Sequence, residues 1–234
     1  MYHENIPIKT LSNGVKVVDK KEKLDITPEY IADKAFEYFQ KEKCDLVVCL
    51  GDLIDKEDDH KKEVKNLKEV RDVMNEFDIR TFVIMGNHDG FAFEKSEFYQ
   101  ILGEKFTPAF LSVKDKNLVF IDTCYFKNGD HYKPGDTDWT DTYFPYIEEL
   151  KKQLSGISGS TFIFMHQNID PNIREDHRVF NDSEIRDVLE KSNKVKSVFQ
   201  GHFHPGNNSE HNGIKYVTIP AMCESEEGYM VIEI

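Results

Sequence analysis

The chain has 234 residues, of which 39% are hydrophobic and 31% are charged, and its formal net charge is −13. This composition is too apolar for a disordered chain, and the length suits one folded domain over residues 1–234. The longest apolar runs have only about five residues, so we expect no membrane span. The first 20 residues also lack the layout of a signal peptide. The acidic balance argues against binding to a nucleic acid duplex, because such binding needs an excess of Lys and Arg.

The four cysteines are too few for a disulfide scaffold and lack the spacing of a zinc knuckle. Cys44 and Cys49 lie in or beside an apolar segment, where a free thiol behaves as a small hydrophobic side chain. We therefore expect reduced cysteines and a cytoplasmic protein. The alternative is that a start upstream of Met1 carries a signal peptide.

Strands and helices are expected to alternate along the chain. Thr27-Pro28 has the pattern of a helix N-terminus, with Pro at the first helical position. Strands are predicted where short apolar runs occur, over 46–50, 81–85, 118–121, 161–165, 195–199, 214–219 and 229–234. Further helices are predicted over the amphipathic segments 59–76, 94–102, 143–154 and 183–191. This order predicts an α/β layered domain with a mixed sheet.

Polar residues that can bind metal follow four of these strands directly. The four segments are Gly51-Asp52, Gly86-Asn87-His88-Asp89, His166 and Gly201-His202-Phe203-His204. Ligands of open α/β sheets bind beyond the carboxyl ends of the strands, so we expect these side chains to converge. Oxygen and imidazole ligands without thiolate suit divalent metals such as Mn, Fe, Zn or Ni. Each segment alone is a common turn or a core histidine, but four in succession predict a metal site.

With these motifs, the chain resembles the calcineurin-like metallophosphoesterase superfamily from about residue 27 to its C-terminus. The resemblance implies a four-layer αββα sandwich of two mixed β-sheets flanked by helices, with two metals at the carboxyl ends of the strands. It implies that Asp52 bridges both metals. It also implies that Asn87, His166 and His202 complete one metal site and that His204 serves the other.

The resemblance further implies a reaction and the residues that assist it. His88 would protonate or stabilise the leaving group, Asp89 would orient His88, and Asp55 would lie outside this inner set. Two metals about 3.5–4 Å apart hold a bridging hydroxide that attacks phosphorus in line. We therefore expect a metal-dependent phosphoesterase whose substrate is a small phosphomonoester, phosphodiester or nucleotide-like pyrophosphate. The sequence does not fix the oligomeric state.

The superfamily's first motif, Asp-x-His, is absent upstream of Asp52. His3 is the only early histidine, and Met1 stands where the Asp would be. The segment 15–19 follows an Asn13-Gly14 turn and predicts half of a surface hairpin. Either the first strand and its motif precede Met1, or the chain is a divergent member with one complete metal site. We favour the first alternative, because losing a strand from a sheet interior leaves backbone groups unpaired.

These alternatives leave two functions open. Under either alternative, the site of Asn87, His166 and His202 should persist. The chain would therefore bind two ions if the second site also forms, and one ion if it does not. The alternative to an enzyme is a non-catalytic or single-metal scaffold or interaction protein that retains the fold. Retention of His88-Asp89 favours the enzyme, because a scaffold has no physical need for that pair.

Two loops are candidates for the substrate side. The aromatic residues of 125–144 could cover the metals, although packing of the loop onto the domain is the favoured interpretation. Arg174, His177 and Arg178 could bind a distal phosphate or simply belong to a surface loop.

Overall fold

The computed structural model describes residues 8–10, 16–18, 27–225 and 228–234. The first two segments are the strands β1 (Ile8–Thr10) and β2 (Lys16–Val18), which pair antiparallel with Ile8 opposite Val18. The pairing confirms the predicted hairpin. Its Asn13-Gly14 turn lies outside the described residues, and so does His3.

The larger sheet has six strands in the order β5-β6-β7-β8-β10-β9. The strands are β5 (Leu111–Val113), β6 (Lys116–Ile121), β7 (Ser160–Met165), β8 (Val195–Gln200), β9 (Asn207–His211) and β10 (Ile214–Thr218). Neighbouring strands from β6 to β10 run parallel, whereas β5 and β9 pair antiparallel at the two edges. The sheet is therefore mixed, as predicted, and the carboxyl ends of its parallel strands meet along one border.

The second sheet, as far as the structure describes it, consists of β3 (Leu46–Cys49) and β4 (Arg80–Val83). These strands run parallel, with Leu46 opposite Arg80. In this part of the chain the second sheet is thus parallel rather than mixed. Parallel pairing places the ends of β3 and β4 side by side, where the predicted ligands begin.

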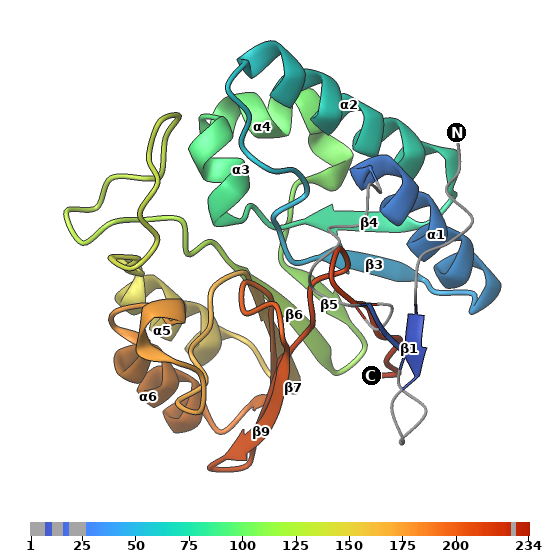
Figure 1. The fold of residues 1–234 in the computed structure, drawn as a ribbon. Helices are drawn as coiled ribbons and strands as arrows, with labels where there is room; N and C mark the ends of the chain where they lie inside the picture. The colour runs from blue at the N-terminus through green and yellow to red at the C-terminus, as the bar shows by residue number, and fades with distance from the viewer. Residues whose placement is uncertain (1–7, 11–15, 19–26, 226–227) are drawn as a thin grey trace.

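Helices cover the outer face of each sheet (Figure 1). The helices α1 (Pro28–Lys41), α2 (His60–Glu76) and α4 (Lys95–Leu102) pack on β3 and β4, and α5 (Ile147–Gly156) and α6 (Asp182–Ser192) pack on the larger sheet. The connections contain the short helix α3 (Asn87–Ala92) and two 3₁₀ turns at Glu104–Phe106 and Glu175–His177. The result is the predicted αββα sandwich.

Alternating side chains along the strands build the apolar layers of this sandwich. Val48 of β3 and Phe164 of β7 belong to the layer between the sheets. Their neighbours point the other way, Val47 toward α1 and α2 and Ile163 toward α5 and α6. Because protein covers both faces of these strands, nearly every position is apolar. This explains the short continuous apolar runs in the sequence.

Most predicted elements are confirmed within a few residues. At the start of α2, for example, the Asp59 side chain accepts a hydrogen bond from the Lys61 backbone N–H at 3.0 Å. The strand predicted over 229–234 is wrong, because its described residues 229–234 join no ladder. Tyr229 instead packs its ring against Tyr38 and Phe39. The edge strands β5 and β9 are not among the predicted elements. β5 has only three residues and β9 is a polar run, so neither carries an apolar pattern.

The cysteines are free thiols, as expected from their number and spacing. Burial raises the pKa of the Cys49 thiol to about 12, which makes it a core side chain rather than a reactive one. Among the described residues, no helix combines the length and apolar character that a membrane span requires.

Candidate metal centre

Two loops bring Asp52 and Asn87 together beyond β3 and β4. Gly51 and Asp52 adopt left-handed φ angles of 104° and 55°, which turn the chain sharply after β3. Gly86 lies directly against this turn. A Cβ atom on Gly86 would meet the Asp52 carboxylate and lie 2.8 Å from Cε1 of His166. Only a residue without a side chain lets these three strand ends approach so closely.

The four residues predicted around one metal lie together in the structure. Nε2 of His166 is 3.2 Å from Oδ2 of Asp52 and 3.0 Å from Oδ1 of Asn87. His202, with a left-handed φ of 63°, places its Nδ1 2.8 Å from the same Asn87 oxygen. The ligand atoms of Asp52, His166 and His202 all lie within 4.8 Å of one another. Both sheets contribute to this centre.

A backbone carbonyl fixes the orientation of His166. Its Nδ1 donates to the carbonyl oxygen of Leu50 at 2.7 Å, which turns Nε2 toward Asp52 and Asn87. Metal-binding histidines are commonly held in this way, because the second hydrogen bond sets both the tautomer and the ring direction.

Buried neighbours control the charge of these groups. Burial alone would raise the pKa of the Asp52 carboxyl, but the surrounding imidazoles, His166 foremost, hold it below its usual range. Burial and the charge of His166 together lower the pKa of His202 to about 3. Asp52 is therefore ionised and His202 neutral at pH 7, and these are the forms that bind a cation.

The donor set fits a divalent cation. Asn87 Nδ2 and His202 Nε2 are buried without a hydrogen-bond partner among the described residues, although buried polar atoms in folded proteins are normally paired. Carboxylate and amide oxygens together with two imidazoles form a mixture that Mn, Fe, Zn or Ni accepts. Asp52, Asn87, His166 and His202 are the residues that would hold the ion.

Asp89 lies beneath the Asp52 loop rather than beside His88. Its carboxylate accepts hydrogen bonds from the backbone N–H groups of Asp52 at 2.8 Å, Gly86 at 3.0 Å and Leu53 at 3.1 Å. Burial, and then the charge of Asp52, raises the pKa of the Asp89 carboxyl. No hydrogen bond or ion pair among the described residues joins the Asp89 and His88 side chains, although the charge of Asp89 contributes to raising the pKa of His88. Through these backbone bonds, Asp89 ties the two loops together.

Asp55 is the carboxylate that meets His88. Its Oδ1 lies 3.1 Å from Nδ1 of His88, and the His88 backbone N–H donates to Oδ1 of Asp52 at 2.9 Å. The hydrogen bond to Asp55 is the main cause that raises the pKa of His88 to about 9. The side chain is 38% exposed. His88 is therefore a protonated, reachable imidazolium beside the candidate metal centre.

His204 stands apart from the group of four ligands. Its Nδ1 lies 3.0 Å from Oε1 of Glu224, and both side chains are 44% exposed. Sequence reasoning missed Glu224, because it lies 20 residues downstream in a segment without a motif.

Aromatic residues of the 125–144 loop have two different environments. Tyr132 is fully buried and packs on Phe91 and Phe126, as the favoured interpretation of the loop predicted. Trp139 instead lies edge-on to His202, with ring centroids 5.9 Å apart. The loop therefore both packs on the domain and reaches the candidate metal centre.

The loop that follows His166 brings an imidazole, rather than an arginine, to the candidate metal centre. The ring of His177 lies 5.3 Å from that of His202. The two nearby arginines are paired with carboxylates, Arg174 with Asp176 and Arg178 with Asp182. A phosphate clamp made of these arginines would first have to break those ion pairs.

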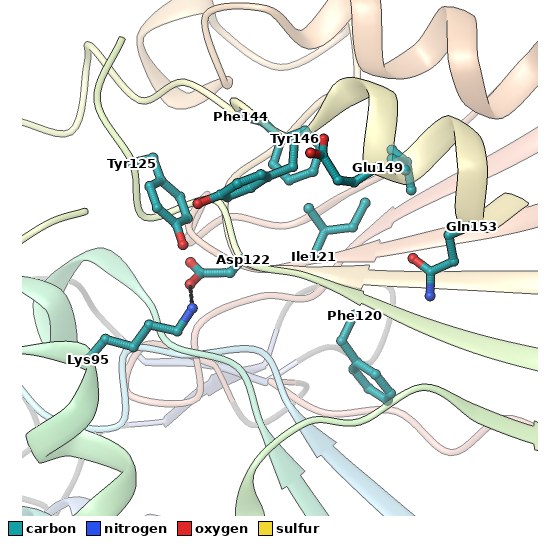
Figure 2. Close-up of a pocket in the computed structure, with 10 residues that line it drawn as sticks. Lys95, Phe120, Ile121, Asp122, Tyr125, Phe144, Tyr146, Glu149 and Gln153 are labelled. Atoms are coloured by element: carbon teal, nitrogen blue, oxygen red, sulfur yellow. Dashed lines mark hydrogen bonds and ion pairs between the residues drawn. The ribbon is translucent and has the colours of Figure 1, made fainter. Parts of the chain in front are cut away.

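A cavity of about 240 Å³ lies near the end of β6, and its lining is drawn in Figure 2. Ile121 is opposite Met165 in the β6–β7 register, so Asp122, which follows β6, lies beside the strand end that carries His166. Asp122 of the cavity wall is thus about one strand spacing from that ligand's backbone.

An ion pair and two tyrosines in edge-to-face contact form part of the cavity wall (Figure 2). Oδ2 of Asp122 lies 2.6 Å from Nζ of Lys95 and 3.1 Å from Nε2 of His131. The rings of Tyr125 and Tyr146 meet edge to face at 5.2 Å. No sequence pattern marked Asp122, because its partners come from α4 and from the following loop.

Solved structures with the same arrangement of elements include enzymes. A dimetal phosphatase from Danio rerio has a TM-score of 0.70 at 14% identity, with 95% of this chain and 85% of that chain covered. GAP50, the anchor in the inner membrane complex of Plasmodium, has a TM-score of 0.59 at 16% identity, with 89% and 72% covered. Phosphopantetheinyl hydrolase from Mycobacterium tuberculosis has a TM-score of 0.50 at 9% identity, with 75% and 79% covered. At these identities the likeness shows the fold alone.

The sequence itself identifies the family. No curated protein matches the chain significantly. The profile described as calcineurin-like phosphoesterase, however, matches residues 29–206, which include Asp52, Asn87, His166, His202 and His204. That span covers most of the chain and every strand end that carries a predicted ligand. The chain belongs to the calcineurin-like phosphoesterase family, a family of metal-dependent phosphoesterases.

Proposed function

We propose that this chain is an active metal-dependent phosphoesterase that hydrolyses a small phosphomonoester, phosphodiester or nucleotide-like pyrophosphate. The observation that carries the proposal is the convergence of Asp52, Asn87, His166 and His202 beside a protonated His88. A binding module would need the ligands alone. An imidazolium next to them supplies what hydrolysis also requires, a proton for the leaving group.

Each residue has a distinct role in the proposed reaction. Bound divalent ions supply Lewis-acid chemistry, which activates a water and offsets negative charge on the phosphate. Asp52 and Asn87 contribute oxygen ligands, and His166 and His202 contribute imidazole nitrogens. His88 keeps its Nδ1 toward Asp55, so Nε2 is the atom that would give a proton to the leaving-group oxygen. Asp89 holds the Asp52 loop in place through the backbone.

The test compares hydrolysis and metal content in the Mn²⁺-loaded protein, with p-nitrophenyl phosphate and bis(p-nitrophenyl) phosphate as substrates. His88→Ala should keep its Mn²⁺ but lose about 10²–10⁴-fold in turnover, the usual contribution of a general acid. Asn87→Ala should lose metal and activity together. His60→Ala is the matched control, because His60 is 48% exposed and pairs with Glu63 and Glu97 rather than with a candidate ligand. An undiminished rate in His88→Ala would remove His88 from the mechanism.

One observation favours a second function, a single-metal scaffold or interaction protein. Among the described residues, the group of close ligands accounts for one ion. The neighbour from Plasmodium is described as an anchor, so the fold also occurs in a protein with a non-catalytic description. Bound Mn²⁺ without hydrolysis of either ester would favour this function.

A further inference from the structure

We infer that Glu224 is a positioning residue for a second divalent cation: its carboxylate accepts the Nδ1–H of His204 and presents Nε2 of His204 as a ligand atom. The inference rests on the proposed function in taking this end of the sheets to be a metal centre. It assigns a role to a residue that no motif marks.

The geometry of the pair supplies the first argument. Oε1 of Glu224 lies 3.0 Å from Nδ1 of His204, which is hydrogen-bond distance. A hydrogen bond at Nδ1 fixes the tautomer that leaves the lone pair on Nε2. His166 has the same arrangement, with the Leu50 carbonyl at Nδ1 and the candidate ligands at Nε2. A carboxylate behind a histidine also makes the ring a stronger ligand.

The backbone around the pair supplies the second argument. The N–H of Ala221 donates to the carbonyl of His204 at 3.0 Å, and the N–H of Glu224 donates to the carbonyl of Ala221 at 3.0 Å. Farther back, the N–H of Ile219 donates to the carbonyl of Gln200 at 2.8 Å. These bonds hold the segment after β10 against the loop after β8. The backbone of Glu224 is thus held beside His204 by the fold, within reach of its side chain.

The third argument concerns the number of protein ligands at the second site. Within the described residues, the ligands expected there are Asp52 and His204. A site with few protein ligands depends strongly on the basicity and direction of each one. An anionic partner for His204 improves both.

The experiment titrates the metal-free full-length chain with Mn²⁺ by calorimetry, and follows the bound ions by electron paramagnetic resonance. The wild type should bind two ions. Glu224→Ala should weaken the second ion by about 10–100-fold, the usual effect of losing such a partner, and leave the first unchanged. Glu224→Gln should fall between the wild type and Glu224→Ala, because its amide oxygen still accepts the Nδ1–H but carries no negative charge. The matched control is Glu210→Ala, an exposed position on β9.

Three results would overturn the inference. The first is a second ion bound by Glu224→Ala as tightly as by the wild type, which would make the pair a simple surface contact. The second is equal loss in Glu224→Gln and Glu224→Ala, which would make the carboxylate a direct ligand. The third is a single ion in the wild type. If the wild type binds a single ion and still hydrolyses the esters, the inference fails and the proposed function stands. If it binds two ions without hydrolysis, the proposed function fails and the inference stands.

Discussion

Gly86 determines the geometry of the candidate metal centre because it has no side chain. It packs between the Asp52 carboxylate and the ring of His166, which come from different sheets. The same residue donates its backbone N–H to Asp89 at 3.0 Å. Any Cβ at this position would push apart the residues that have to share an ion.

Replacing Gly86 by Ala should weaken Mn²⁺ binding by at least about tenfold, as disruption of residues behind metal ligands usually does. It should also destabilise the fold by about 1–3 kcal/mol through overpacking. Calorimetric titration and urea unfolding measure the two effects. Gly156→Ala is the matched control, since a Cβ atom on Gly156 would meet no neighbouring side chain or segment within 4 Å. Equal Mn²⁺ affinity in both variants would show that the ligands tolerate the methyl group.

Among the elements, α4 is joined to the end of β6 by the ion pair of Lys95 with Asp122, the residue that follows this strand. Burial opposes ionisation of Asp122, but the hydrogen bond from His131 and the charge of Lys95 outweigh it and lower the pKa of the carboxyl to about 2. An unfolded chain has an Asp pKa near about 3.9. The ionised form therefore stabilises the fold above about pH 4–5, and that stabilisation is lost as the pH falls toward 2.

Asp122→Asn should remove this part of the pH dependence. Between pH 6 and pH 3, the wild type should lose about 1 kcal/mol more of its free energy of unfolding than the variant does. Urea unfolding at a series of pH values measures the difference. Asp115→Asn, at a carboxylate that is 71% exposed, should follow the wild type. Parallel curves for the wild type and Asp122→Asn would contradict the role given to the ion pair.

At the scale of the whole molecule, the candidate metal centre joins the two sheets. Asp52 and Asn87 follow β3 and β4, whereas His166 and His202 follow β7 and β8. The apolar layer between the sheets, with Phe164 stacked between Phe120 and Phe199, holds the same two sheets together. An ion bound by ligands from both sheets would act as a cross-link in the folded state only.

Mn²⁺ should therefore raise the melting temperature, and a chelator should reverse the rise. At a free concentration of 100 times Kd, binding to the folded state alone adds about 2.7 kcal/mol to the free energy of unfolding. Thermal unfolding of the wild type and His202→Ala, each with and without Mn²⁺, measures the effect. The variant should show little shift. An equal shift in both proteins would mean that the ion binds elsewhere on this acidic chain.

Local patterns predicted most elements, because apolar runs and helix caps are properties of neighbouring residues. The runs at 46–50 and 161–165 became β3 and β7, and Asp59 became the N-cap of α2. The predictions failed where a segment becomes a strand only by pairing with another segment of the chain. The apolar segment 229–234 lacks a ladder partner among the described residues, and the polar β9 is a strand only because β10 pairs with it.

The sequence by itself determined the family, the layered α/β fold and the convergence of Asp52, Asn87, His166 and His202. It could do so because motifs that directly follow parallel strands have to meet at one border. Only the tertiary structure decided which group each carboxylate contacts. Asp55 contacts His88, Glu224 contacts His204, and Asp89 contacts the backbone of the Asp52 loop. The physical reason is that a hydrogen bond depends on separations of about 3 Å in space, and residues far apart along the chain reach that separation only when the sheets and loops have packed.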